Sequence, residues 1–391
     1  MVGLPPTTRQ RLRVLVAMSG GVDSAVAAHL LRAAGHEVAG ATMKLFCYGD
    51  REGPPRPCCD LEAIRAARSS ARRLGIPHTV VDVEEAFGRH VIGDFIDEYA
   101  GARTPNPCVR CNTDVKFGPL LDKAHRMGFD AIATGHYVRC EPIRGDEPDW
   151  GLFRAVDREK DQSYVLWGLD RRRLDRCLFP LGGVRKPVVR RLARRLGIPS
   201  WDRPESQDIC FVPPGGHGAF LSERLPADHP MRRPGPIRHV DGERLGRHDG
   251  LLGFTIGQRK GTGTATGERL YVVRIDPSSA TLWLGPRAAT RCAGLVTEGG
   301  NLLAPPPLLE EDGVIARIRY RHAGAPCRVR ILREGCWEVR FAQPQPAVAE
   351  GQSVVFYRQD RVIGGARIGK TVPASPEPSH DLQTARMDRS I

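Results

Sequence analysis

The chain has 391 residues, 41% hydrophobic and 26% charged, which is too long for one ordinary core and suits a globular protein of two or three domains. Its first thirteen residues carry three arginines and no continuous apolar stretch, and nothing later approaches eighteen apolar residues in a row. We therefore expect neither a secretory signal nor a membrane span. Eleven cysteines in such a chain argue against a disulfide framework, so we expect a cytoplasmic protein.

The charge balance is strongly basic, with 58 Lys and Arg, 45 Asp and Glu and a formal net charge of +13. Because basic side chains that neutralise phosphates supply most sequence-independent affinity for nucleic acid, this balance indicates a polyanionic partner. Only seven of the basic residues are lysines, so genome composition is an alternative source of the arginine excess. The distribution of the basic residues along the chain favours nucleic-acid binding, since residues 170–205 hold eleven basic and four acidic residues, a net charge of +7.

The N-terminal half alternates short apolar runs with segments of helical composition. The predicted strands are 13–18, 38–44, 79–83 and 131–134. The predicted helices are 25–34, 61–74, 87–99 and 117–127. This alternation is typical of an α/β fold with a doubly wound parallel sheet, in which ligands bind at the carboxyl ends of the strands. Residues 105–112 are expected to form a loop between two of these helices.

A further basic helix is predicted at 186–196, and the composition changes after residue 211, where Pro- and Gly-rich turns separate short runs of β-type composition. The predicted strands are 270–275, 281–284, 314–320, 328–332 and 354–358. We predict a catalytic domain over 10–212 with a basic helical segment at 165–205, a small mixed central domain over 213–282 and an all-β domain over 283–371. Residues 372–391 are rich in Pro, Ser and charge and are predicted to be disordered.

One motif of the N-terminal half predicts a phosphate site. Residues 19–24 read Ser-Gly-Gly-Val-Asp-Ser and stand between a predicted strand and a predicted helix, where backbone N–H groups and the helix dipole favour an anion. The glycines allow close backbone approach, and Ser19 and Ser24 supply hydroxyl groups. Asp23 fits beside a phosphate only with an ion between them, so we predict Mg²⁺ at Asp23.

Residues 364–371 formally match the Walker A pattern G-x-x-x-x-G-K-[ST]. A Walker loop must lead into a helix, whereas Val-Pro-Ala-Ser-Pro follows here and cannot propagate one. We therefore predict a terminal β-strand at this position and no nucleotide site.

Three cysteines are candidates for chemistry. Cys108 and Cys111 form a lone C-x-x-C, and Cys210 lies about a hundred residues further along the chain. A lone C-x-x-C is compatible with a redox pair, half of a zinc site with help from Cys58 and Cys59, part of an iron–sulfur site, or coincidence. Because we expect no helix to begin at the motif and lower a thiol pKa, the redox pair is disfavoured.

Six motifs in this order closely resemble the bacterial tRNA-specific 2-thiouridylase family, MnmA. They are 19–24 (SGGVDS), 104–112 (TPNPCVRCN), 134–137 (TGHY), 160–164 (KDQSY), 205–211 (ESQDICF) and 254–261 (FTIGQRKG). The resemblance runs from about residue 13 to 365. It implies an N-type ATP pyrophosphatase domain, a small central domain and a C-terminal β-barrel.

The resemblance also implies the reaction and its partners. ATP, with Mg²⁺, adenylates the C2 oxygen of the wobble uridine in tRNAs for Lys, Glu and Gln, and sulfur then displaces AMP. A cysteine desulfurase or a sulfur-relay protein is the implied sulfur donor, and we expect a monomer. Adenylation turns a poor leaving group into a good one, and a persulfide divides a difficult transfer into easier steps.

The resemblance assigns roles residue by residue. Cys210 would carry the persulfide, and Cys111 would be the nucleophile that attacks it, releasing sulfide or forming a disulfide with Cys210. Contacts to the nucleotide are implied for Ala17, Met18, Ser19, Gly20, Gly21, Val22, Asp23, Ser24, Met43 and Gly135. Contacts to tRNA are implied for Asn106, Pro107, Cys108, His136, Lys160, Asp161, Gln162, Arg319, Tyr320 and Gln352, with Asn106 to Cys108 facing the target base.

Cys108 departs from the family pattern, because many relatives have aspartate there. With cysteine at this position, Cys108 becomes an accessory ligand that, together with Cys111 and Cys210, would hold an iron–sulfur cluster carrying the sulfide. This alternative stays open beside the persulfide route.

Two other classes of protein are compatible with the phosphate loop. They are ATP-dependent amidotransferases and ligases, which share the loop, and a non-enzymatic RNA-binding scaffold, which would keep the nucleotide only as a structural ligand. The cysteines, the basic segment and the β-rich C-terminal region favour the thiouridylase.

Overall fold

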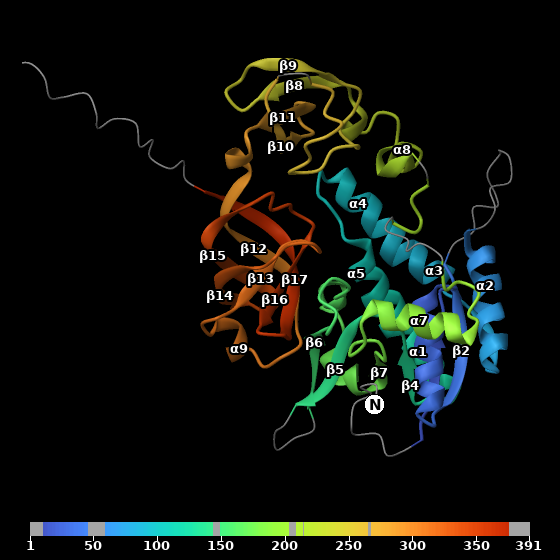
Figure 1. The fold of residues 1–391 in the computed structure, drawn as a ribbon. Helices are drawn as coiled ribbons and strands as arrows, with labels where there is room; N and C mark the ends of the chain where they lie inside the picture. Colours follow the sequence, from blue (N-terminus) through green and yellow to red (C-terminus); the bar gives the residue numbers. More distant parts are fainter. Residues whose placement is uncertain are drawn as a thin grey trace, which may run out of the picture.

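The computed structural model describes residues 11–45, 59–143, 149–202, 209–213, 215–264 and 267–374. Figure 1 shows a lower α/β part, an upper β part and a β-barrel beside them. The predicted disorder of 372–391 falls almost entirely outside the described residues, as do Cys58 and most of the 205–211 motif. No described helix is long and apolar enough to cross a membrane.

The α/β part is built on one parallel sheet of order β3-β2-β1-β4-β7, which confirms the predicted fold class. Its strands are β1 (Arg13–Ala17), β2 (Glu37–Lys44), β3 (His78–Asp82), β4 (Ala131–Ala133) and β7 (Cys177–Leu178). The strand order reverses between β1 and β4, and the loops after these two strands therefore border the crevice where such sheets bind ligands.

Helices cover both faces of this sheet, and the residues of β1 alternate between the two cores. Val14 and Val16 are 0% exposed and pack with α1 (Val22–Ala33), α2 (Cys59–Leu74) and α7 (Lys186–Leu196). Leu15 is 1% exposed and belongs to the core on the other face, with the helices of residues 84–126. The sheet is therefore buried on both sides, as its apolar strands predict.

The segment 84–126 corrects the sequence prediction. It contains α3 (Glu84–Phe87), a π-helical stretch Gly88–Gly93, α4 (Asp94–Ala100), α5 (Pro107–Cys111), a second π-helical stretch Asn112–Leu120 and α6 (Leu121–Arg126). The predicted loop at 105–112 is wrong, since a helix begins at Pro107. The Asn106 side chain accepts from the N–H of Val109 at 3.4 Å, and proline suits the first helical position because it lacks an N–H.

The upper part is a small sheet of order β10-β11-β8-β9 with one helix. Its elements are α8 (Gly216–Ser222), β8 (Gly235–His239), β9 (Arg244–His248), β10 (Tyr271–Asp276) and β11 (Thr281–Gly285). The predictions of strands at 270–275 and 281–284 agree with β10 and β11, whereas the sequence did not predict β8 and β9. In β9 only the final residue is buried, so the strand shows no apolar alternation.

The C-terminal part is a closed six-stranded barrel, β12-β15-β14-β13-β16-β17, closed by pairing of β12 with β17. Its elements are β12 (Arg291–Leu302), α9 (Pro307–Glu310), β13 (Ile315–Arg317), β14 (Ala325–Arg333), β15 (Cys336–Pro346), β16 (Ser353–Arg358) and β17 (Arg361–Pro373). Trp337 and Phe356 fill its centre, with ring centroids 5.7 Å apart. Residues 364–371 lie within β17, so the prediction of a strand in place of a Walker loop is confirmed.

A hairpin from the α/β part extends the barrel sheet, a feature that the sequence did not predict. It consists of β5 (Val138–Ile143) and β6 (Asp149–Arg154), and Phe153 of β6 pairs with Arg361 of β17. Short 3₁₀ turns occur elsewhere, at Ser163–Leu166, Arg171–Arg176, Pro230–Arg232 and Arg287–Thr290. The barrel is therefore fixed to the catalytic part by backbone pairing in addition to side-chain contacts.

A buried carboxylate completes this junction. The side chain of Asp161 is 1% exposed and accepts from Nε of Arg154 at 3.1 Å and from Nη1 of the barrel residue Arg317 at 3.3 Å. The same carboxylate accepts from the hydroxyl of Ser163 at 3.0 Å, and Ser163 also lies 3.1 Å from the Tyr357 hydroxyl of β16. Buried charges persist only when they are paired and hydrogen-bonded, as this one is.

We expect Asp161→Asn to destabilise the protein by about 3 kcal/mol, because it leaves Arg317 buried without its counter-charge. The measurement is urea unfolding followed by tryptophan fluorescence and by limited proteolysis of the barrel. The matched control is Asp312→Asn, since Asp312 is 93% exposed and its ion pair with Arg328 spans 3.8 Å. A loss of tRNA affinity in Asp161→Asn with unchanged stability would contradict this structural role.

Candidate active site

The loop between β1 and α1 has the geometry of an anion site. Gly20 has a φ of +77°, and a Cβ there would lie 2.7 Å from the carbonyl oxygen of Ala63 in α2. Gly21 is the N-cap of α1 and gives the helix no side-chain cap. The first N–H groups of α1 and the positive end of its dipole therefore favour an anion at this point.

The rest of the predicted nucleotide residues support this loop. The Ser24 hydroxyl donates to the Gly21 carbonyl at 3.2 Å and accepts from the N–H of Ser19 at 3.3 Å, so it stabilises the turn, while the Ser19 side chain is exposed. Met18 is 2% exposed and its N–H donates to Ala41 at 2.8 Å. Ala17 ends β1, Val22 begins α1 and half-buried Met43 lies near the end of β2.

Gly135 brings the loop after β4 against the phosphate loop. A Cβ at Gly135 would lie 2.7 Å from the backbone nitrogen of Ser24 and 2.8 Å from the carbonyl carbon of Asp23. Only glycine permits this approach. The structure therefore brings two of the predicted nucleotide-contacting segments together at the point where the strand order reverses.

The Asp23 carboxylate holds a lysine that the sequence analysis missed. The ammonium of Lys186 lies 2.8 Å from Oδ1 and 2.7 Å from Oδ2 of Asp23, and the Tyr137 hydroxyl donates to Oδ1 at 2.8 Å. Lys186 is 5% exposed and begins α7, where its N–H donates to Asp157 at 2.8 Å. Lys186 follows the sequence Gly-Gly-Val-Arg, in which we recognised no phosphate-binding motif.

This ion pair bears on the predicted magnesium site. In the described arrangement both oxygens of Asp23 bond to Lys186, so Mg²⁺ does not fit at Asp23 unless the lysine moves. Mg²⁺ at Asp23 stays a prediction. A buried ammonium beside the phosphate loop is itself a suitable partner for a nucleotide phosphate.

Cys108 and Cys111 lie on α5, one helical turn apart and directly after the Asn106 cap. Cys108 is exposed and Cys111 is half-buried, and neither forms a disulfide. The Cys108 side chain is exposed to water at its surface, but the protein around it desolvates the thiolate and so raises the pKa of Cys108. The positive charge of Lys116 lowers this pKa and offsets part of the increase. Lys116 donates to the Asn112 side chain at 2.9 Å and so stays on the same helical segment.

Cys210 is anchored by its neighbour. Cys210 is exposed and forms no disulfide, while Phe211 is 2% exposed. The Phe211 ring packs edge-on against Phe87 and Phe95, with centroids 5.8 and 5.1 Å away. The described residues contain no group of three or more His, Cys, Asp or Glu side chains placed to hold a metal ion. The structure therefore brings Cys108 and Cys111 together but does not gather Cys210 with them into a ligand set.

The barrel contacts the start of α5. Gln352 donates from Nε2 to the carbonyl of Pro105 at 2.8 Å. The Tyr164 hydroxyl donates to the Ser353 carbonyl at 2.7 Å, and the Asn106 side chain lies near enough to this phenol to lower its pKa slightly, against the larger increase from burial. Several predicted tRNA residues therefore lie around the cysteine helix, although they come from distant parts of the chain.

The remaining predicted tRNA residues differ in accessibility. Tyr320 is 38% exposed, with its ring 6.2 Å from that of Tyr164, and Arg319 is half-buried and donates to the Pro346 carbonyl at 3.2 Å. Gln162 accepts from the N–H of Tyr137 at 2.9 Å, and Lys160 beside it is half-buried. Asp161 is buried in the junction with the barrel, so its side chain reaches tRNA only if that network opens.

His136 lies in the loop after β4, half-buried between the rings of Phe117 and Phe179. Desolvation, and secondarily the Lys116 charge, hold the pKa of its imidazole well below the ordinary value. Its Nδ1 lies 2.7 Å from the Thr134 hydroxyl. His136 is therefore a neutral hydrogen-bonding group at physiological pH rather than a cation for phosphates.

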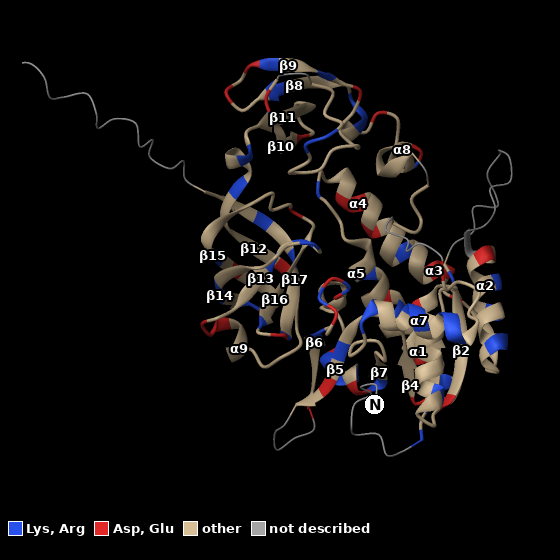
Figure 2. Cartoon of the chain, in the orientation of Figure 1, with Lys and Arg blue, Asp and Glu red and all other residues tan. Residues whose placement is uncertain are grey.

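Basic side chains gather on the outer helices. Figure 2 shows Lys and Arg along α2 and α7, and on β8 and β9. The two helices are joined by Arg73, whose Nε donates to the Leu196 carbonyl at 2.8 Å. The basic segment that the sequence singled out therefore belongs to one side of the catalytic part, with exposed side chains at Arg190, Arg191, Arg194 and Arg195.

Comparisons with known families agree with this architecture. Residues 12–214 match the model described as "tRNA methyl transferase HUP domain", residues 219–286 the "tRNA methyl transferase PRC-barrel domain" and residues 294–368 the "Aminomethyltransferase beta-barrel domain". The chain is thus a tRNA-modifying protein with a HUP-type catalytic domain followed by two β domains.

Curated relatives specify the family. The chain is 43% identical to tRNA-specific 2-thiouridylase MnmA 1 of Caldanaerobacter subterraneus subsp. tengcongensis, over 92% of this chain and 98% of that protein. It is 45% identical to MnmA of Methylobacterium nodulans (93% and 96%) and 46% identical to MnmA of Thermus thermophilus (91% and 94%). The chain belongs to the tRNA-specific 2-thiouridylase family, MnmA, and is a tRNA sulfurtransferase.

The raised pKa of Cys108 predicts its reactivity. We expect alkylation of Cys108 by iodoacetamide to rise with pH about a midpoint above that of an unstructured cysteine peptide, because only the thiolate reacts. Lys116→Gln should move the midpoint higher still, since the ammonium now lowers the pKa. Peptide mass spectrometry measures both, and a midpoint at or below that of the peptide would contradict the burial argument.

The Asp23–Lys186 pair predicts a nucleotide phenotype. Lys186→Gln should raise the KM for ATP about tenfold, because a charge-assisted hydrogen bond to phosphate is worth about 1.5–3 kcal/mol. We expect Asp23→Asn to raise the same KM, since Lys186 loses its anchor, and an unchanged Mg²⁺ concentration for half-maximal rate would limit Asp23 to this anchoring role. Pyrophosphate release measures both. A large shift of the Mg²⁺ requirement in Asp23→Asn alone would instead make Asp23 the metal ligand.

Proposed function

We propose that the chain replaces the C2 oxygen of the wobble uridine in tRNAs for Lys, Glu and Gln with sulfur, using ATP to activate the base. The observation that carries this proposal is the position of α5. Its cysteines follow a cap, Asn106, that the catalytic domain contacts through Tyr164, and the preceding Pro105 is held by Gln352 of the barrel. A base drawn out of the anticodon loop would meet Cys108 and Cys111 there, and unpaired bases are those that a protein can take from the stack.

The first step would be adenylation. The ribose and adenine of ATP would lie near Met43 and Gly135, and its phosphates near residues 19–24 and the Lys186 ammonium. The uridine O2 attacks the α-phosphorus, the bond to pyrophosphate breaks, and pyrophosphate leaves. The N–H groups at the start of α1 stabilise the charge that develops on the phosphates. Mg²⁺ bound with the nucleotide would neutralise further phosphate charge.

The second step would deliver sulfur from a persulfide on Cys210. The Cys111 thiolate attacks the inner sulfur of this persulfide, forms a Cys111–Cys210 disulfide and releases hydrosulfide. Hydrosulfide attacks C2 of the activated base, and the bond from C2 to the AMP oxygen breaks, so AMP leaves. A two-electron thiol reductant then restores both cysteines. For the Cys111–Cys210 disulfide, Cys210 must approach α5, and its exposed position next to the anchored Phe211 suits a donor protein's access.

The cluster alternative on Cys108, Cys111 and Cys210 needs three thiols at one point. The described residues do not gather them, so the cluster, like the Cys111–Cys210 disulfide, requires Cys210 to approach α5. The wobble base would contact Asn106, Pro107 and Cys108, and the surrounding tRNA would contact His136, Lys160, Gln162, Arg319, Tyr320 and Gln352.

We also propose a sulfur donor, a location and an oligomeric state for the enzyme. The sulfur donor is a cysteine desulfurase or a relay protein that docks near Cys210, and the enzyme acts as a cytoplasmic monomer. We keep the proposed domain borders near residues 212 and 282, although residue 282 lies within β11 and the barrel strands begin at Arg291.

We expect Cys111→Ser and Cys210→Ser to abolish thiouridine formation while pyrophosphate release on tRNA stays within about twofold of wild type, because the thiols act after adenylation. The measurement is nucleoside mass spectrometry of a tRNA transcript incubated with enzyme, ATP and a persulfide donor. Cys336→Ser, a half-buried barrel cysteine, is the matched control and should keep full activity. Thiolation by Cys210→Ser at the wild-type rate would overturn the persulfide route, and iron with acid-labile sulfide in active protein would favour the cluster.

A further inference from the structure

The persulfide route gives no chemical step to Cys108, although this cysteine lies beside the sulfur that the reaction oxidises. Cys108 is exposed, forms no disulfide and stands three residues before Cys111 on α5. Burial raises the pKa of Cys108, and a charge on Cys111 raises it further, so the two thiols are close enough to repel each other when both are ionised. A second thiol is therefore within reach of any disulfide that Cys111 forms.

The helix that begins at Pro107 changes the interpretation of the C-x-x-C. The sequence disfavours a redox pair because it predicts no helix start there, whereas α5 begins at Pro107 and helical structure continues through Asn112–Leu120. Residues three apart on a helix have Cβ atoms about 5–6 Å apart, and a disulfide needs about 3.5–4.5 Å. A small adjustment of the first helical turn therefore suffices for a bond between Cys108 and Cys111.

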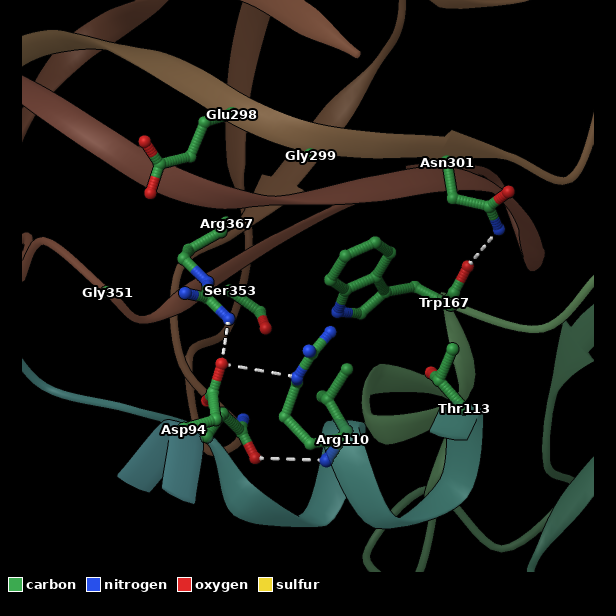
Figure 3. Close-up of a pocket in the computed structure, with 13 residues that line it drawn as sticks. Asp94, Arg110, Thr113, Trp167, Glu298, Gly299, Asn301, Gly351, Ser353 and Arg367 are labelled. Atoms are coloured by element: carbon green, nitrogen blue, oxygen red, sulfur yellow. Dashed lines mark hydrogen bonds and ion pairs between the residues drawn. The ribbon is translucent and has the colours of Figure 1, made fainter. Parts of the chain in front are cut away.

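The opposite face of α5 is held in place by Arg110, the residue before Cys111. Nε of Arg110 lies 3.3 Å from the Asp94 carboxylate and Nη1 lies 3.1 Å from Asp114. Asp94 also accepts from Nη2 of Arg367 of β17 at 2.6 Å, and Figure 3 shows these side chains beside a cavity of about 430 Å³ between α5 and the barrel. The helix is thus fixed to the barrel, and its two cysteines stay neighbours.

Cys210, in contrast, lies on a segment that is anchored elsewhere. The ring of Phe211 packs against Phe87, Phe95 and Phe220, with centroids 5.8, 5.1 and 5.5 Å away. The described residues do not gather Cys210 with the cysteines of α5. Cys210 therefore reaches Cys111 only when its segment moves, and the packing of Phe211 favours its return.

Lys116 supports a thiolate on Cys108. Its ammonium donates to Oδ1 of Asn112 at 2.9 Å, and Asn112, which is 1% exposed, donates from Nδ2 to the Val165 carbonyl at 3.0 Å. The ammonium is thereby held on the cysteine-bearing helical segment, and its charge opposes the rise that burial causes in the pKa of Cys108. Because the thiolate is the form that attacks a disulfide, this cation favours exchange at Cys108.

We propose that Cys108 is the resolving cysteine of the sulfur-transfer cycle and that its thiolate attacks Sγ of Cys111 in the Cys111–Cys210 disulfide. The bond between Cys111 and Cys210 breaks, the bond between Cys108 and Cys111 forms, and the electron pair leaves on the Cys210 thiolate. No oxidant is needed, because the cysteines were oxidised when hydrosulfide was released. The two-electron thiol reductant of the proposed function then opens the Cys108–Cys111 disulfide.

This inference rests on the proposed function, which supplies the Cys111–Cys210 disulfide. Exchange within one helix is intramolecular and therefore precedes attack by an external thiol. It returns Cys210 to its exposed position beside the anchored Phe211, where a sulfur donor can load it again while the pair on α5 is reduced. Cys108 would thus separate the loading of sulfur from the reduction of the enzyme.

The test locates the disulfide after one turnover. Full-length protein is loaded with one equivalent of sulfur from glutathione persulfide, freed of reductant, mixed with a tRNA transcript and ATP, and quenched with iodoacetamide. Cleavage before aspartates leaves Cys108 and Cys111 together on the peptide 97–113 and Cys210 on the peptide 208–227. Mass spectrometry therefore distinguishes a disulfide within the first peptide from a link between the two peptides, and nucleoside analysis counts the thiouridine formed.

In the wild-type protein we expect the peptide 97–113 to carry an internal disulfide and Cys210 to be alkylated. In Cys108→Ser the two peptides should stay linked, with about one link per thiouridine formed, because no neighbouring thiol resolves the disulfide. In Cys210→Ser both thiols of the first peptide should be alkylated. Cys336→Ser, a half-buried barrel cysteine, is the matched control and should give the wild-type pattern, and thermal unfolding checks that each variant folds.

A persistent link between the two peptides in the wild-type protein would overturn the proposal, as would thiouridine formed with all three cysteines alkylated or an internal disulfide in Cys210→Ser. An internal disulfide that depends on Cys210 but is accompanied by no thiouridine would contradict the proposed function alone. Neither disulfide nor thiouridine would contradict both.

Discussion

The junction between the barrel and the catalytic domain is the constraint on which the rest of the site depends. Asp161 has a side chain 1% exposed and binds arginines from both parts, while Tyr164, the residue after Ser163, reaches the Ser353 carbonyl and the Asn106 cap. Removing a charge from such a network leaves its partners buried and unpaired. The same contacts that hold the barrel in place therefore hold the start of the cysteine helix.

In the proposed reaction, two different regions of the structure would serve the nucleotide and the base. The crevice at the strand reversal gathers backbone N–H groups and Lys186, which suit phosphates, whereas the surroundings of α5 offer thiols and charged side chains that are paired with one another. His136, with its lowered pKa, stands on the loop between them and adds no positive charge. Positive charge is concentrated on the outer helices α2 and α7.

Departures from the predicted pattern occur where distant segments meet. The helix at Pro107 was missed although Asn-Pro is a helix-start signal, because the surrounding Thr-Pro-Asn-Pro reads locally as a turn. The β5–β6 hairpin was missed because its partner, β17, lies about two hundred residues away in the sequence. The residue pattern of one strand does not indicate which other strand it pairs with.

The sequence by itself determined the parallel sheet, the phosphate loop, the rejection of the Walker pattern in β17 and the three candidate cysteines, because each depends on local spacing or on motifs that resemble a known family. Only the tertiary structure decided that Lys186 neutralises Asp23, that Asp161 is buried, and that Arg110, Thr113 and Trp167 line one cavity beside the barrel. These relations join residues tens to hundreds of positions apart. They depend on which surfaces the packed domains bring into contact, and that information is absent from any short stretch of the chain.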